Sequence, residues 1–137
     1  MLSSFGSNSI STTGNVTANN FVGNINGYSI GYLEMPQVSA GNVTLALSDS
    51  GKHYFSNTAG NLTLTIPNNT AVTFNTGTAI AIVVQAAGNV LVNASAGVTL
   101  YMAGNSTAGN RVVGSYGMAT LLKTGTNTWF INGTGVS

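Results

Sequence analysis

The chain contains no cysteine, only two prolines and very few charged residues. The missing cysteine excludes both a disulfide framework and a thiolate metal site. Charged residues make up 4% of the 137 residues, whereas ordinary soluble domains contain about 25%. The net charge of +1 gives no electrostatic footprint for nucleic acid, and no basic amphipathic stretch indicates binding to an anionic membrane.

Long hydrophobic runs are also missing. The most apolar stretch, residues 79–84, has the length of a strand, and no run approaches the ~18 residues of a membrane-spanning helix. Met1 is followed by Leu-Ser-Ser-Phe-Gly, which has neither the basic region nor the apolar core of a secretory signal. The absence of cysteine suits folding in a reducing cytoplasm.

Polar character comes instead from Asn, Thr, Ser and Gly, which carry no charge. One interpretation is a monomer kept in solution by hydroxyl and amide groups. The other is a surface that sister subunits or a larger assembly cover, because a protein with little net charge has little self-repulsion. We favour the second interpretation.

Short apolar segments with the alternation of half-buried strands recur along the chain, and no segment shows helical spacing. The alternation is cleanest in Leu62-Thr63-Leu64-Thr65-Ile66. The predicted strands are 43–47, 62–66, 78–85, 89–93, 98–102, 118–123 and 128–132. Strands at this spacing predict an all-β fold for residues 31–137, an antiparallel β-sandwich or jelly-roll-like barrel.

Between the strands, an Ala-Gly-Asn sequence recurs with its asparagine at positions 42, 61, 89, 105 and 110. Gly and Asn tolerate the left-handed backbone of tight turns. The uneven spacing argues against a solenoid of fixed period. We therefore interpret these sequences as hairpin turns of one sandwich.

Residues 1–30 form a separate, extended N-terminal arm in this interpretation. They are rich in Ser, Asn and Gly, with too little apolar content to build a core. They are either a disordered leader or an arm that becomes ordered against a partner, and we favour the arm. The apolar residues that would contact the partner are Phe5, Ile10, Val16, Phe21, Val22 and Ile25.

Candidate catalytic residues are few, and the only cluster of ionisable side chains is Asp49-Ser50-Gly51-Lys52-His53. A phosphate-binding loop would need an earlier glycine and a Ser or Thr after the lysine, and both are missing. Near-adjacent Ser, His and Asp residues on one turn would not reach triad geometry. We interpret the cluster as a turn between two strands, in which Asp49 accepts backbone hydrogen bonds.

Other chemistry also lacks residues. A metal site needs several ligands, and the chain offers one histidine and two acids, Glu34 and Asp49, which would also have to form any hydrolytic carboxylate pair. The sequence thus predicts no enzyme, cofactor or metal. Trp129 and Phe130 are adjacent in a strand, so one should enter the core and the other should face a neighbour or solvent. A sugar-stacking platform is the less favoured role.

Five segments of residues 31–137 resemble a β-rich module of virion proteins from tailed bacteriophages, particularly cyanophage-like ones. They are LSDSGKH (47–53), LTIP (64–67), GTAIAI (77–82), GMATLLK (117–123) and WFINGTG (129–135). The segment TGNVTANNF (13–21) resembles one found in phage fibre-like proteins. None of these segments is a catalytic signature.

The resemblance implies a structural component of the virion. Because the chain begins with its own Met1 and has no long shaft, we expect a stand-alone capsid decoration (cement) protein on the capsid surface. Its partners would be the major capsid protein and itself, as a homotrimer, without nucleic acid or membrane. The alternative is a tail-fibre or tail-tip module that binds a host surface glycan.

Overall fold

The computed structural model describes Thr13, residues 35–38 and residues 40–137. The described residues contain eight strands, a single-turn 3-10 helix η1 (Leu47–Asp49) and no α-helix. The strands are β1 (Val43–Thr44), β2 (His53–Ser56), β3 (Leu62–Ile66), β4 (Ala79–Val84), β5 (Val90–Ala94), β6 (Thr99–Met102), β7 (Arg111–Lys123) and β8 (Thr128–Val136). The all-β class predicted from the sequence is confirmed.

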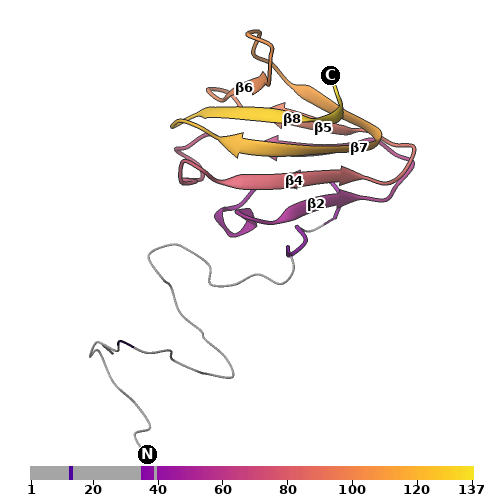
Figure 1. Ribbon diagram of the computed structural model, residues 1–137, viewed down its shortest axis with the longest axis horizontal. Coiled ribbons are helices and arrows are strands. Elements are labelled where there is room, and N and C mark those ends of the chain that lie inside the picture. Colours follow the sequence, from indigo (N-terminus) through magenta and orange to yellow (C-terminus); the bar gives the residue numbers. More distant parts are fainter. Residues whose placement is uncertain (1–12, 14–34, 39) are drawn as a thin grey trace, which may run out of the picture. The chain divides into compact units, whose positions relative to one another are not determined.

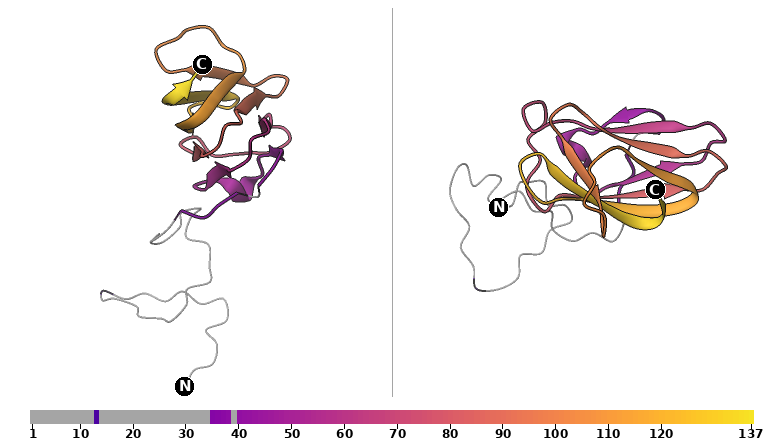
Figure 2. Two further views of the ribbon diagram at one scale, coloured as in Figure 1. Left: turned by 90° about the vertical axis from the view of Figure 1, so that its right-hand side faces the viewer. Right: turned by 90° about the horizontal axis from the view of Figure 1, so that it is seen from above.

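The strands form one continuous mixed sheet that folds into two layers (Figure 2). Strands β1, β3 and β5 are parallel neighbours in one layer, and β2 and β4 are parallel neighbours in the other. Strand β7 joins the layers, since residues 111–113 pair with β5 and residues 118–122 pair with β4. Figure 1 shows β2, β4, β7 and β8 side by side in front of β5.

The core lies between the layers and follows the alternation of the strands. On β3, Leu64 and Ile66 point inward and are fully buried, as are Ile80 and Ile82 of β4. Trp129 of β8 is 1% exposed and meets the ring of Phe74 edge-on, with the centroids 5.5 Å apart. This buried aliphatic and aromatic cluster forms the core that holds the two layers together, and no disulfide contributes to it.

The pairing corrects the prediction of an antiparallel sheet built from hairpins. Strands joined by the turns at Asn61 and Asn89 do not pair with each other, because they lie in different layers. The chain instead alternates between the two layers, so that each strand pairs in parallel with the next strand but one: β1 with β3, β2 with β4 and β3 with β5. Both Leu62↔Val90 and His53↔Ala81 are 28 residues apart, whereas Val43↔Leu64 is 21 residues apart. This winding therefore has no fixed period.

Asparagine side chains tie successive turns of this winding together. Oδ1 of Asn42 accepts from the backbone N–H of Thr63 at 2.8 Å, and Oδ1 of Asn61 accepts from that of Asn89 at 2.9 Å. Oδ1 of Asn89 in turn accepts from the N–H of Ser115 at 3.1 Å. These three asparagines thus join successive turns of the winding, and each accepts a hydrogen bond from a backbone N–H group.

Individual strand bounds follow the prediction closely except at three places. Residues 43–47 are a strand only as far as Thr44, and η1 follows. Strand β7 begins at Arg111, well before the predicted residue 118. Its pairing with β8 shifts register between Val113 and Met118, but the strand continues through this irregularity. Strand β8 continues to Val136.

Strand β2 has no counterpart among the predicted ranges. The predicted domain boundary at residues 30/31 lies outside the described residues.

Candidate interaction surface

The outer side of the layer that contains β2, β4, β7, β8 and β6 is the clearest candidate for a functional surface. Alternate residues of these strands point away from the core, and the pairing places them in rows across the layer. One row is Phe55, Val83, Met118 and Thr134, a second is His53, Ala81, Thr120 and Asn132, and a third is Ala79, Leu122, Phe130 and Tyr101. We call these residues the outward face. None of them is Asp, Glu, Lys or Arg.

Large apolar side chains on the outward face are open to solvent. Met118 is 57% exposed, Leu122 is 42% exposed and Phe130 is 37% exposed. Leu122 and Phe130 are paired neighbours, whereas Met118 lies two rows away, beyond the row of Thr120 and Asn132. Exposed large apolar side chains on one face make that face a candidate binding surface. Tyr116, which is 76% exposed, lies nearby in β7 with a positive φ of 57°.

A shallow depression of about 430 Å³ lies at one end of the outward face. It is lined by Ala103, Thr120, Leu122, Thr124, Phe130 and Asn132, and its surface is almost entirely apolar. The ring of Phe130 tilts by 39° against that of Tyr101, with the centroids 5.3 Å apart. The depression is therefore a place where an apolar group of a partner could enter.

The adjacent aromatic residues of β8 behave as their spacing predicts. Trp129 enters the core and is 1% exposed, whereas Phe130 faces outward. The expectation that one would be internal and the other external is confirmed. The role of Phe130 in binding stays a prediction.

The Asp49–His53 cluster runs from the end of η1 through a turn at Ser50 and Gly51 to the first residue of β2, so the predicted turn lies at its centre. Oδ2 of Asp49 accepts from the N–H of Ala46 at 2.8 Å, and Lys52 Nζ lies 3.4 Å from the other carboxylate oxygen. Gly51 has the positive φ of 75° that the turn requires.

The Ser, His and Asp side chains of this turn bond in different directions. Nδ1 of His53 lies 2.9 Å from the carbonyl oxygen of Met35, and the Ser50 hydroxyl donates to Oγ1 of Thr78 at 3.4 Å. The turn therefore contains no hydrogen-bonded triad of these three residues.

The remaining candidates from the sequence add no further site to the described part of the chain. In it, no group of three or more His, Cys, Asp or Glu side chains is placed to hold a metal ion. The same residues include no helix long and apolar enough to cross a membrane. Glu34 and the six arm residues Phe5, Ile10, Val16, Phe21, Val22 and Ile25 lie outside the described residues.

Most of the outward face was not anticipated from the sequence. Residues 79–84 are apolar on both sides of the strand, and residues 118–123 have apolar residues on both sides, with Thr120 on one and Lys123 on the other. A strand that is apolar on both sides is either buried on both sides or has one apolar face open, and the sequence does not distinguish these cases.

The chain was also compared with known proteins. No protein-family model and no curated protein matches this sequence.

Proposed function

We propose that the protein is a structural component of a tailed-phage particle, a capsid decoration protein that binds the outer capsid surface and stabilises the shell. The observation that carries this proposal is the outward face, which presents Met118, Leu122 and Phe130 to solvent without a formal charge. Such a face suits docking onto another protein, because its burial releases water from apolar surface and desolvates no charged side chain. The virion setting rests on the sequence resemblance.

The mechanism of stabilisation would be non-covalent. Each copy would bury its outward face across neighbouring capsid subunits and so resist their separation under internal genome pressure. We propose a homotrimer as the docking unit, since closed symmetry covers self-complementary surfaces and sheet edges. The choice of a trimer follows the resemblance to phage proteins.

A second candidate is a tail-fibre module that binds a host surface glycan. The observation in its favour is the exposed ring of Phe130 beside Tyr101 at the depression, since sugar rings stack on aromatic faces. The nearly apolar lining of the depression favours a protein partner, because a glycan needs several hydrogen bonds.

Copy number and location distinguish the two candidates. Quantitative gel densitometry of purified particles, with localisation by electron microscopy, should show many copies spread over the head. A few copies confined to the tail would contradict the decoration function.

A matched pair of variants tests the surface itself. Leu122→Asp places a charge on the outward face and should abolish binding to capsids that lack the protein. Thr126→Asp places the same charge on an exposed residue between β7 and β8 that is neither part of the outward face nor in the lining of the depression, and it should leave binding intact.

A further inference from the structure

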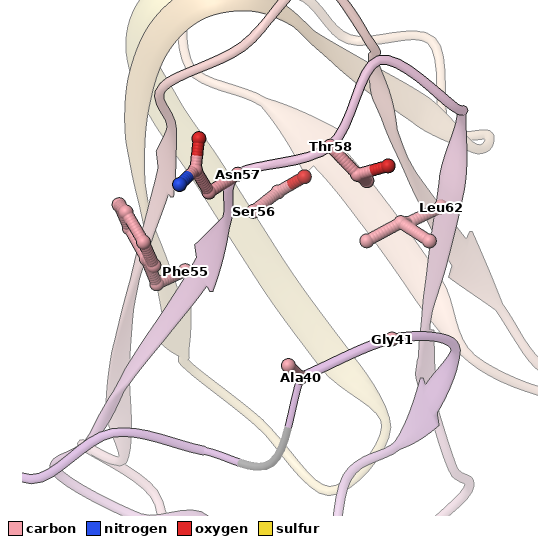
Figure 3. A pocket seen from close by; sticks show the side chains of 7 residues that line it. All are labelled: Ala40, Gly41, Phe55, Ser56, Asn57, Thr58 and Leu62. Atoms are coloured by element: carbon pink, nitrogen blue, oxygen red, sulfur yellow. The ribbon is translucent and has the colours of Figure 1, made fainter.

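A cleft opens between the end of β2 and the start of β3 (Figure 3). It encloses about 450 Å³, within the range of ligand pockets, roughly 300–1,000 Å³. It is lined by Ala40, Gly41, Phe55, Ser56, Asn57, Thr58 and Leu62. None of these side chains is charged, so the cleft suits an uncharged occupant.

The cleft contains a buried polar group without a partner. Ser56 is 1% exposed, and its hydroxyl has no hydrogen-bond partner among the described residues. The side chains of Ser56 and Leu62 point into the space between β2 and β3, whereas Phe55 points away from it (Figure 3). A buried hydroxyl in this position is unfavourable unless an occupant supplies a hydrogen bond.

The neighbouring edge of β2 is only partly paired. At His53 the edge pairs with residues 36–38 of the same chain. The N–H of His53 donates to the carbonyl of Pro36, and its carbonyl accepts from the N–H of Val38, both at 2.9 Å. Phe55, two residues later, presents its backbone to the same edge. Within the described residues, no loop residue forms a backbone hydrogen bond with Phe55 or Asn57. A strand edge of this kind beside a pocket is the arrangement that binds extended peptides.

We propose that this cleft receives the N-terminal segment, residues 1–34, of a second copy of the chain. The segment adds a short strand to the β2 edge, inserts an apolar side chain beside Leu62 and hydrogen-bonds to the Ser56 hydroxyl. Residues 1–33 carry no charged side chain and contain isolated apolar residues among Ser, Asn and Gly, which matches the uncharged cleft.

The second copy is favoured over the same chain by where the segment joins the body. Residues 36–38 already lie along the β2 edge at His53, and Ala40 and Gly41 line the cleft. A segment that ends at Glu34 would have to fold back over these residues to reach its own cleft. When extended, the 34 residues of the segment span up to about 110 Å, which is long enough to reach the cleft of a neighbouring copy.

Disulfide trapping in the full-length protein tests the proposal without any capsid. Since the chain has no cysteine, each introduced cysteine is the only one present. One chain carries Thr58→Cys at the cleft, and an isotopically heavy chain carries a single cysteine beside an apolar arm residue, at Ser11, Thr17, Asn20 or Asn24. After mixing and mild oxidation, mass spectrometry quantifies the mixed dimer. The control chain carries Thr126→Cys in place of Thr58→Cys.

The expected result is a mixed dimer that forms faster with Thr58→Cys than with Thr126→Cys for at least one arm position. Adding Ser56→Ala to the cleft chain should reduce this rate roughly two- to tenfold, the effect of one lost neutral hydrogen bond. Ser56→Ala removes an unpartnered hydroxyl from a buried position, so it should not impair folding.

Two outcomes would overturn the proposal. Equal rates with Thr58→Cys and Thr126→Cys at every arm position would show that the cleft does not receive the segment. A chain with both Thr58→Cys and an arm cysteine that closes only within itself would show that the segment occupies its own cleft. Neither outcome bears on capsid binding through the outward face, so the two proposals fail separately.

Discussion

Nζ of Lys123 donates a hydrogen bond to the carbonyl oxygen of Phe74 at 2.6 Å, from inside the body. Lys123 is 3% exposed, and its ammonium also donates to Oδ1 of Asn69 at 2.6 Å. Within the described residues no carboxylate pairs with it, since the ion pair found there joins Lys52 and Asp49. A buried cation thus fastens the long loop between β3 and β4 to the end of β7.

This lysine should make stability depend on pH. Burial lowers the pKa of Lys123 below its ordinary value of 10.5. Between the lowered pKa and 10.5 the unfolded chain binds more protons than the folded chain, so the free energy of unfolding should rise with pH. Lys123→Met should remove this rise, and Lys52→Met, on a partly exposed lysine, should keep it.

Urea unfolding at a series of pH values checks this prediction. The series should stop near pH 10.0, because burial raises the pKa of Tyr54 above that value and its contribution has the opposite sign. A wild-type free energy of unfolding that does not change as the pH approaches 10.0 would contradict the prediction.

Gly88 should be intolerant of any side chain. A Cβ at this position would lie 2.3 Å from the carbonyl oxygen of Gly60 and 2.6 Å from that of Thr58, where one turn of the winding packs on the next. Gly88→Ala should lower the free energy of unfolding by about 1–3 kcal/mol, the usual cost of overpacking. Gly109→Ala, in another Ala-Gly-Asn turn with open space around the new Cβ, should change it by less than about 0.5 kcal/mol. Equal denaturation midpoints for the two variants would show that Gly88 does not pack closely against the carbonyl groups of Thr58 and Gly60.

The asparagines between turns of the winding should contribute to stability. Asn61→Ala removes the acceptor for the N–H of Asn89, and Asn89→Ala removes the acceptor for the N–H of Ser115. Each substitution should cost about 0.5–1.5 kcal/mol, the net value of one hydrogen bond. Asn75→Ala is the control, because Asn75 is exposed and forms no side-chain hydrogen bond within the described residues. Thermal unfolding that ranks all three variants alike would contradict the structural role.

Local features of the fold could be predicted from the sequence, whereas its winding could not. The alternation in Leu62–Ile66 predicted β3 with its observed bounds, because inward Leu64 and Ile66 meet the core. An Ala-Gly-Asn turn reverses the chain in either a hairpin or a crossing between layers, and its sequence does not specify which. The parallel pairing therefore depends on contacts between strands that are distant in the sequence.

The first half of β7 was missed for a different reason. Gly114, Ser115 and Gly117 have the composition of a turn, but they lie within a continuous strand. A Cβ at Gly117 would lie 2.8 Å from the carbonyl oxygen of Thr134, so the glycine there allows two strands to approach closely. For the candidate surface, the sequence predicted only that one of the adjacent Trp129 and Phe130 would face outward, without specifying which.

Trp129 and Phe130 should separate folding from binding, because the backbone turns their side chains to opposite sides of β8. Trp129→Ala removes a 1% exposed ring from the core and should cost about 3–5 kcal/mol of stability. Phe130→Thr keeps a strand-favouring residue on the outward face and should cost less than about 1 kcal/mol. If the outward face docks on the capsid, Phe130→Thr should nevertheless weaken binding by about 2 kcal/mol, roughly thirtyfold, as expected for an aromatic anchor. Co-sedimentation with capsids that lack the protein measures this affinity, and urea unfolding measures stability. A folded Phe130→Thr variant that binds capsids as tightly as the wild type would exclude Phe130 as an anchor and move the docking surface elsewhere.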